Sequence, residues 1–373
     1  MKKIAVLGAG MVGRAMAIDL AKDYDVVSVD LDTEALSRMR RDHGIATRQA
    51  DLSDPQQVKK TVAGMDLVVG AVPGFLGFRV LEAVIEAGVH AVDISFFNEN
   101  PFDLDELART NGVTAVMDIG VAPGMDNIIL GYHLERMEVN RFECLVGGLP
   151  RERRWPYEYK APFSPIDVLE EYTRPARIVV GGQVVVKPAL SEIEPLDFEG
   201  VGTLEAFNSD GLRSLVQTCS KVPNMIERTL RYPGHATLMR ALRETGFFSK
   251  EPIEIRGQSI RPLDLSARLL FPMWKLGEQE EEFTVMRVTV EGPARAYTYD
   301  LLDRYDAATQ TSSMARTTGY TATGAARLVL EGRYKHAGIS PPEYLGKSEE
   351  NFRFLLAHLA ARGVHYRVRE TKA

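Results

Sequence analysis

The sequence predicts an α/β fold, a doubly wound parallel sheet followed by a second α+β domain with a largely antiparallel sheet. The first half alternates short, almost continuously apolar runs with stretches at helical spacing. This is the pattern of a parallel sheet that helices cover on both faces. After Gly124 the expected strands become longer and more polar. Right-handed crossovers favour a Rossmann arrangement for the first half.

The first expected strands share a buried, apolar character and lie at Lys3 to Leu7, Val26 to Asp30, Asp66 to Val72, His90 to Ser95 and Val113 to Asp118. Between them, helical spacing is clearest over residues 11–22 and 33–43. A length of 373 residues exceeds one average domain.

Beyond residue 142 the pattern favours antiparallel pairing. Residues 177–186 contain Gly181-Gly182, a hairpin turn signal, and residues 283–291 and 295–301 predict further strands. Helical patterns return near Ser312, so we expect a first domain over 1–124 with a C-terminal return over 308–373. The second domain is expected over 125–307.

Composition excludes several classes of protein. The net charge of -6 argues against a nucleic-acid partner, which would require a basic stripe. Two cysteines are too few for a disulfide framework and fit a reducing compartment. With no apolar run of eighteen residues and no signal-peptide core, we expect a cytoplasmic protein without a membrane span.

A G-x-G-x-x-G motif, Gly8, Gly10 and Gly13, follows the first strand and opens the first helix. The first glycine permits a tight turn, the second lets backbone approach a pyrophosphate, and the third lets helix and strand pack closely. Met11 and Val12 would add helix N-terminal amides, which favour phosphate. A glycine cluster in a non-binding α/β domain is the alternative.

Asp30 ends the second expected strand, where a carboxylate can accept hydrogen bonds from both ribose hydroxyls and repel a 2′-phosphate. The sequence therefore favours NAD over NADP, with Asp32 as a possible substitute. Ala71, Val72 and Pro73 end another strand and are expected beside the nicotinamide ribose, although ordinary turn chemistry explains them equally well.

Several motifs together resemble the saccharopine dehydrogenase/reductase family over essentially the whole chain. They include residues 93–96 (DISF), 118–127 (DIGVAPGMDN), 147–150 (GGLP), 208–210 (NSD), 229–232 (TLRY) and 313–319 (SMARTTG). Residues 71–78 (AVPGFLGF), 170–177 (EEYTRPAR), 209–214 (SDGLRS) and 229–235 (TLRYPGH) are most similar to the NAD-dependent L-lysine 6-dehydrogenase branch.

The resemblance implies an enzyme that oxidises the ε-amine of L-lysine with NAD, giving an imine that hydrolyses to the semialdehyde and ammonia, after which the aldehyde cyclises. It also implies that Asp93 and Ser95 lie at the coenzyme, that Phe96 lies at the substrate, and that the chain forms a homodimer. Domain 1–124 would bind NAD, and domain 125–307 would bind substrate and dimerise. Saccharopine reductases usually use NADPH, carry tyrosine in place of Phe96, and have cysteine in place of Val146.

Amine oxidation needs a neutral nitrogen, so a group must remove a proton from the ammonium or lower its pKa. Asp126, after a Pro-Gly turn at the carboxyl edge of the sheet, is the first candidate for contact with the amine. Alternatively, Asp126 has a structural role as the N-cap of a helix that starts at Asn127. Lys160 and His235 are further acid–base candidates, although such residues are more often structural or solvated.

Arg231 and Arg316 could each bind the substrate α-carboxylate through a guanidinium fork, or could form ordinary salt bridges. Asp210 suits the α-ammonium but could simply form an Asx turn. Thr318 is expected to open a helix near the nicotinamide end. Scattered histidines and cysteines give no metal site.

Two other functions remain open. Saccharopine or a carboxyalkyl polyamine, such as carboxynorspermidine, would require a second cation, which Arg213, Arg228 or Arg240 could supply. A protein that binds NAD without turnover is the third possibility.

Overall fold

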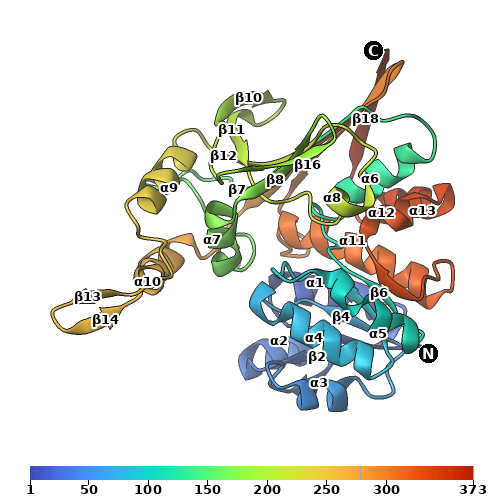
Figure 1. The fold of residues 1–373 in the computed structure, drawn as a ribbon. Coiled ribbons are helices and arrows are strands. Elements are labelled where there is room, and N and C mark those ends of the chain that lie inside the picture. Colours follow the sequence, from blue (N-terminus) through green and yellow to red (C-terminus); the bar gives the residue numbers. More distant parts are fainter. Residues whose placement is uncertain (278, 373) are drawn as a thin grey trace. The chain divides into compact units, whose positions relative to one another are not determined.

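The computed structural model describes residues 1–277 and 279–372, which form two compact units (Figure 1). The first unit comprises Met1–Glu138 and Met314–Tyr366, and the second comprises Val139–Ser313 and the segment from Arg367 on. The first unit continues past Gly124 because α6 (Met125–Leu134) packs against α12 (Pro342–Gly346). The C-terminal return ends at Tyr366, since the last strand belongs to the sheet of the second unit.

The first unit contains a seven-stranded sheet in the order β17-β6-β5-β4-β1-β2-β3, and all its pairs are parallel. This order confirms the predicted doubly wound sheet, whose direction of winding reverses between β1 and β4. Its strands are β1 Lys3–Leu7, β2 Asp25–Asp30, β3 Ala46–Gln49, β4 Leu67–Gly70, β5 His90–Asp93, β6 Thr114–Val116 and β17 Gly338–Ser340.

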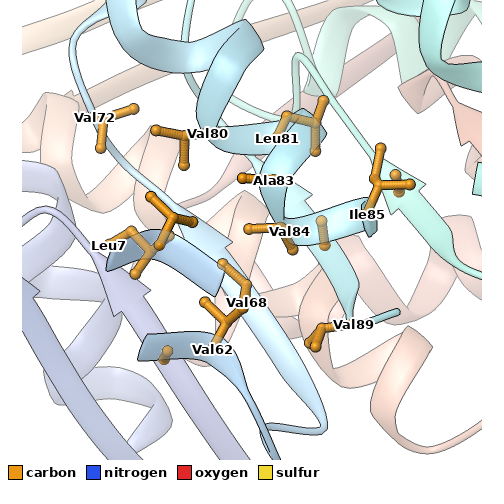
Figure 2. Close-up of a cluster of buried hydrophobic side chains, with 14 of the residues drawn as sticks. Leu7, Val62, Val68, Val72, Val80, Leu81, Ala83, Val84, Ile85 and Val89 are labelled. Atoms are coloured by element: carbon orange, nitrogen blue, oxygen red, sulfur yellow. The ribbon is translucent and has the colours of Figure 1, made fainter. Parts of the chain in front are cut away.

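The first unit contains helices that pack on this sheet and others, α6 and α12 among them, that pack against one another. They are α1 Met11–Leu20, α2 Thr33–His43, α3 Pro55–Val62, α4 Gly74–Glu86, α5 Asp105–Thr110, α6, α11 Ser313–Leu330, α12 and α13 Glu349–Ala360, with a 3-10 turn η1 at Pro101–Leu104. Figure 2 shows side chains of α4, among them Val80 and Val84, gathered with Leu7 and Val68 of the sheet. This apolar contact fixes α4, and therefore the loop before it, on the sheet.

A buried ion-pair network joins the C-terminal return to α1. The carboxylate of Asp19, 1% exposed, accepts hydrogen bonds from Arg327 Nη1 at 3.0 Å, Arg362 Nε at 2.8 Å and Thr323 Oγ1 at 2.7 Å. Two guanidinium groups compensate the desolvation of one carboxylate, as a buried charge requires. Residues separated by about three hundred positions therefore hold the first helix in place.

The second unit contains a mainly antiparallel sheet in the order β10-β11-β12-β7-β15-β16-β18, with β8 and β9 attached to β12. In this sheet β7 and β12 pair in parallel, whereas β10–β11, β11–β12, β7–β15, β15–β16, β8–β9 and β8–β12 pair antiparallel. The bounds are β7 Arg141–Pro150, β8 Ala176–Val180, β9 Gln183–Lys187, β10 Glu194–Phe198, β11 Gly202–Asn208, β12 Met225–Arg231, β15 Glu282–Glu291, β16 Arg295–Arg304 and β18 Tyr366–Lys372.

The predicted hairpin joins β8 to β9 through Gly181 and Gly182, whose φ angles are 56° and 78°. Two consecutive positive φ angles are what a type I′ turn requires, which explains the glycine pair. A small separate hairpin, β13 Ile253–Ile255 with β14 Gln258–Ile260, precedes the last helix of this unit. The helices are α7 Pro165–Thr173, α8 Leu215–Thr218, α9 His235–Glu244 and α10 Pro262–Trp274.

Candidate functional site

In the glycine turn between β1 and α1, two glycines are required by the packing of the chain and one leaves open space. A Cβ on Gly8, whose φ is 109°, would overlap the carbonyl oxygen of Ala71, and a Cβ on Gly13 would overlap that of Gly8. A Cβ on Gly10 would meet no atom of the described chain within 4 Å. The first and third glycines are therefore required by the fold, while the second leaves open space before the helix. That space fits a pyrophosphate.

The N-terminus of α1 faces this open space. Gly10 is its N-cap, and no side chain in the described residues caps it. The amides of Met11 and Val12, in the first turn, have no acceptor within the helix itself. An uncapped helix start with its partial positive charge suits an anionic group.

Asp30 lies at the same turn. Its Oδ2 accepts a hydrogen bond from the amide of Ala9 at 2.6 Å, and its Oδ1 accepts one from Asp32 at 2.9 Å. Asp32 instead caps α2 by accepting from the amides of Glu34 and Ala35. Of the two carboxylates considered from the sequence, Asp30 is the one beside the glycine turn.

The end of β4 borders the turn on its other side. The amide of Ala71 donates to the carbonyl of Leu7 at 2.8 Å, and Ala71 also contacts the space beside Gly8. Val72 is buried in the apolar core, and Pro73 is the N-cap of α4. This segment can therefore present mainly backbone and the Pro73 ring to a ligand.

Asp93 is the last residue of β5, Ser95 follows it by two residues, and both are buried. Asp93 Oδ1 accepts the amide hydrogen of Ser95 at 2.7 Å. Burial and, to a smaller extent, the nearby Asp118 raise the pKa of Asp93 to about 7, against the lowering effect of hydrogen bonds from Ser95. Phe96, which follows, is half-buried.

Asp126 is fully buried in the first turn of α6. The helix begins at Met125, so the expectation of a helix starting at Asn127 is wrong, and Gly124 is the N-cap. The Oδ1 atom of Asp126 accepts the amide hydrogen of Gly124 at 2.9 Å. The φ angle of Gly124, 142°, and the overlap of its would-be Cβ with Gly120 explain why glycine stands there.

Thr318 and Arg316 lie on α11. Thr318 is in the second turn and does not open the helix as expected, because the helix already begins at Ser313. Its side chain contacts the position where Gly120 would carry a Cβ, at 3.3 Å. Arg316 is buried and donates to the carbonyl of Arg362 at 3.1 Å. The first unit thus brings Thr318 to the loop that precedes Asp126.

In the second unit, Arg231 is the centre of a buried cluster. Its guanidinium donates to Glu171 Oε2 at 2.7 Å, the Tyr172 hydroxyl at 3.1 Å and the Tyr159 hydroxyl at 3.4 Å. The carbonyl of Leu230 accepts a further hydrogen bond at 2.9 Å. These contacts engage the guanidinium within its own unit.

His235 belongs to the same cluster. Its Nε2 lies 2.8 Å from the Tyr172 hydroxyl, and its Nδ1 lies 2.8 Å from the carbonyl oxygen of Tyr157. Burial, with the charge of Arg231, lowers the pKa of His235 to about 3. The imidazole is therefore neutral at physiological pH, with both nitrogens engaged.

Asp210 and Lys160 are also engaged within the second unit. The carboxylate of Asp210 accepts hydrogen bonds from Nε and Nη2 of Arg177, each at 2.9 Å, and from the Arg177 backbone amide at 3.1 Å. Lys160 Nζ donates to the carbonyl of Lys275 at 3.2 Å and lies 3.6 Å from Glu280.

Glu171, Tyr172 and Arg177 are the residues that sequence reasoning missed. Each lies in the segment EEYTRPAR, and a buried arginine at the end of β12 requires a carboxylate partner. This requirement could have indicated that Arg231 has a glutamate or aspartate partner. The spacing of residues in the sequence does not show which carboxylate that is.

Two further observations concern the described chain as a whole. Residues 1–277 and 279–372 contain no group of three or more His, Cys, Asp and Glu side chains placed to hold a metal ion. In the same residues, no helix combines the length and apolar character needed to span a membrane.

The sheet order, the glycine turn and the carboxylate beside it define a two-unit protein whose first unit is of the dinucleotide-binding type. Residues 4–116 match the family model described as the saccharopine dehydrogenase NADP binding domain, and residues 120–364 match that of the saccharopine dehydrogenase C-terminal domain. The chain belongs to the saccharopine dehydrogenase family, as the sequence motifs predicted.

Curated relatives are distant. The mitochondrial alpha-aminoadipic semialdehyde synthase of Mus musculus is 24% identical over 278 residues, which cover 70% of this chain and 30% of that protein. A saccharopine dehydrogenase [NADP(+), L-glutamate-forming] of Pyricularia oryzae is 26% identical over 265 residues, 67% of this chain and 59% of the relative. The chain thus matches less than a third of the first relative's length and less than two thirds of the second's.

Solved structures show the same fold. Apo saccharopine dehydrogenase (L-Glu forming) from Saccharomyces cerevisiae has a TM-score of 0.79 at 19% identity, with full coverage of both chains. The homospermidine synthase of Legionella pneumophila, in complex with NAD, has a TM-score of 0.70 at 12% identity and covers 100% of this chain and 91% of its own.

Proposed function

We propose that this chain is an NAD-dependent dehydrogenase that oxidises the ε-amine of L-lysine, a CH–NH₂ donor. The products would be the semialdehyde, which cyclises to piperideine carboxylate, together with ammonia and NADH. The observation that carries the proposal is the Asp30 carboxylate beside the glycine turn, in a chain of a family whose named relatives are dehydrogenases and synthases.

The choice of NAD rests on charge. A carboxylate at the end of β2 accepts hydrogen bonds from ribose hydroxyls and repels a 2′-phosphate. The fungal relatives carry NADP in their names, whereas the Legionella neighbour was solved with NAD. The open space at Gly10, the uncapped start of α1 and Asp30 fit the pyrophosphate and ribose of NAD. NAD, when bound, supplies the hydride acceptor.

The choice of a small primary amine rests on Phe96 and Val146. Saccharopine reductases usually carry tyrosine and cysteine at these two positions, and this chain has an apolar side chain at both. Because the amine must lose a proton before hydride leaves the adjacent carbon, a proton acceptor has to lie near it. Asp126 is proposed to contact the amine, and Arg316 to bind the α-carboxylate.

The residues of the second unit receive more modest roles. Arg231, His235, Asp210 and Lys160 each have partners within that unit, so we propose that they shape its substrate-facing part and are not the acid or base. We also propose a homodimer, which analytical ultracentrifugation of the purified protein would test.

Saccharopine is the second candidate substrate, because several relatives carry its name. One experiment separates the two: the protein is mixed with NAD and either L-lysine or saccharopine, and NADH absorbance is followed. NADH formed from L-lysine alone supports the proposal. NADH formed from saccharopine alone selects the second candidate, and coenzyme binding with no turnover of either amine leaves a binding protein.

A further inference from the structure

A buried carboxyl and a buried hydroxyl lie together at the end of β5. Asp93 is 2% exposed and Ser95 is 3% exposed. The Ser95 hydroxyl lies beside the Asp93 carboxyl, close enough for a weak hydrogen bond that lowers the pKa of Asp93, and within residues 1–277 and 279–372 it has no other hydrogen-bond partner. A buried hydroxyl whose hydrogen bonding is incomplete costs free energy, so its presence requires an explanation.

Two glycines make room for this pair. A Cβ on Gly70, at the end of β4, would overlap Oδ2 of Asp93. A Cβ on Gly77, in α4, would lie 2.7 Å from the Cβ of Ser95. The strand and the helix that pack against the pair thus lack side chains where the pair lies. The fold is built to hold a carboxyl and a hydroxyl there.

The charged neighbourhood of Asp93 is also unusual. Gly70 and Gly77 bring no charge, and the remaining neighbour at the adjacent strand end is Asp118, after β6. Within the described residues no Lys, Arg or His makes an ion pair with Asp93. A buried carboxyl facing a second carboxylate, with no cation, readily accepts a proton.

The strand order places Asp93 and Ser95 on one side of the point between β1 and β4 where the winding reverses. Asp30 is on β2, to one side of β1, whereas Asp93 and Ser95 lie at the end of β5, beyond β4 on the other side. In doubly wound sheets a ligand lies across the carboxyl ends of the strands at this reversal. A dinucleotide with its adenosine ribose at Asp30 therefore extends toward the β5 end, where the reacting groups would meet.

We propose that Asp93 accepts the proton released by the substrate ammonium, with the Ser95 hydroxyl as the relay between them. The ammonium gives a proton to the Ser95 oxygen while the Ser95 hydroxyl proton passes to a carboxylate oxygen of Asp93. One N–H bond breaks, one O–H bond forms on Asp93, and the nitrogen lone pair is released. Asp93 then loses the proton to water. The relay rests on the proposed amine oxidation and deepens it.

Burial raises the pKa of Asp93 to about 7, which suits this task. A proton acceptor works best when its pKa is near the working pH. The relay therefore predicts that kcat/KM for L-lysine rises with pH and levels off above neutral pH.

The test measures pH profiles of kcat/KM with L-lysine and NAD, and NADH binding by fluorescence. At saturating NAD, Asp93→Asn, which keeps the size of the side chain, should lower kcat by about 100-fold or more and abolish the rising limb, a loss that changed coenzyme affinity alone would not produce. Ser95→Ala should produce the same loss. Ser28→Ala is the matched control, because Ser28 is another buried hydroxyl, without a partner in the described chain, but it lies in β2.

Asp118→Asn gives an independent reading that does not depend on how Asp93→Asn folds. Asparagine tolerates the φ of 53° at this position, so the backbone is retained. Removing the negative charge should lower the pKa of Asp93 and move the rising limb to lower pH. An unmoved limb in this variant, or full turnover in Ser95→Ala, overturns the relay. If the unmodified protein oxidises neither L-lysine nor saccharopine, the proposed function fails as well.

Discussion

The carboxylate of Asp30 accepts a hydrogen bond from the backbone amide of Ala9 at 2.6 Å. This contact holds a negative charge against the glycine turn, one residue before Gly10. In the proposed coenzyme site, the carboxylate would meet the adenosine ribose and the start of α1 would meet the pyrophosphate. The proposal therefore assigns coenzyme selectivity and pyrophosphate binding to neighbouring residues, which can be changed separately.

Asp30→Arg should reverse the coenzyme preference. The guanidinium would pair with a 2′-phosphate, and the loss of a charge-assisted hydrogen bond of about 1.5–3 kcal/mol should lower NAD affinity by roughly 10- to 100-fold. The ratio of kcat/KM for NAD and NADP measures this. Asp32→Ser is the control, because serine keeps the cap of α2 while removing a nearby charge. A ratio that stays constant in Asp30→Arg would exclude Asp30 as the ribose ligand.

Gly10→Ala and Gly13→Ala should have opposite effects. Gly10 has a φ of -68°, which alanine adopts, and its Cβ would meet no described atom within 4 Å. The unfolding free energy of Gly10→Ala should stay within about 0.5 kcal/mol of the parent's, while its NADH affinity should fall at least about tenfold. Gly13→Ala should lose about 1–3 kcal/mol of stability, since its Cβ overlaps Gly8. Urea unfolding and NADH fluorescence titration measure both, and a destabilised Gly10→Ala would contradict the assignment.

Asp126→Asn should lower turnover much more than coenzyme binding. Asparagine can still accept the amide hydrogen of Gly124, so the start of α6 is kept. We expect kcat to fall by about 100-fold, with the Kd for NADH within about twofold of the parent's. Steady-state assays with L-lysine measure kcat, and Asp103→Asn, an exposed carboxylate of the same unit, serves as control. Undiminished kcat removes Asp126 from contact with the amine.

Glu171→Ala should destabilise the second unit strongly. It leaves the buried guanidinium of Arg231 without its carboxylate, a change that typically costs about 3–5 kcal/mol. Glu170→Ala is a matched neighbour, because Glu170 pairs with the exposed Lys250 and should cost less than about 1 kcal/mol. Chemical denaturation of both variants gives the comparison. Equal losses would mean that the buried pair contributes no more than the surface pair.

Asp93 should make stability fall as pH rises. Its folded-state pKa, raised by burial to about 7, exceeds the usual value of 3.8, so folding favours the protonated form. That contribution is full below about pH 4 and is lost as pH rises through about 7, by up to about 4 kcal/mol in total. Unfolding free energies between these pH values should show this slope in the parent and lack it in Asp93→Asn. A slope that survives in the variant assigns the effect to other groups.

The first unit was the easier part to predict, because its signals are local. The apolar run of β1, the glycine turn and Asp30 lie within thirty residues, and each has one physical role. By contrast β3 (ATRQ) and β17 (GIS) are short and carry no apolar pattern. They form because neighbouring strands offer a free edge, which depends on the rest of the sheet.

The candidate site was predicted less completely, for a related reason. The partners of Arg231 and Asp210 are Glu171 and Arg177, which lie 60 and 33 positions away. Spacing along the chain does not show such pairings, so the sequence left Arg231 open between substrate binding and a salt bridge, and Asp210 open between substrate binding and an Asx turn. The sequence also offered no sign that the Ser95 hydroxyl is buried beside Asp93, since only the surrounding packing reveals it.

The ion pairs of Asp19 with Arg327 and Arg362 have a consequence for the order in which the chain can fold. A ribosome completes α1 long before either arginine emerges. Until then the Asp19 carboxylate lacks the partners with which it is buried in the folded protein. The helix that starts at the glycine turn can reach its final position only once residue 362 has been synthesised. Completion of the proposed coenzyme site is thereby tied to synthesis of this later segment, and the second unit has the opportunity to fold first.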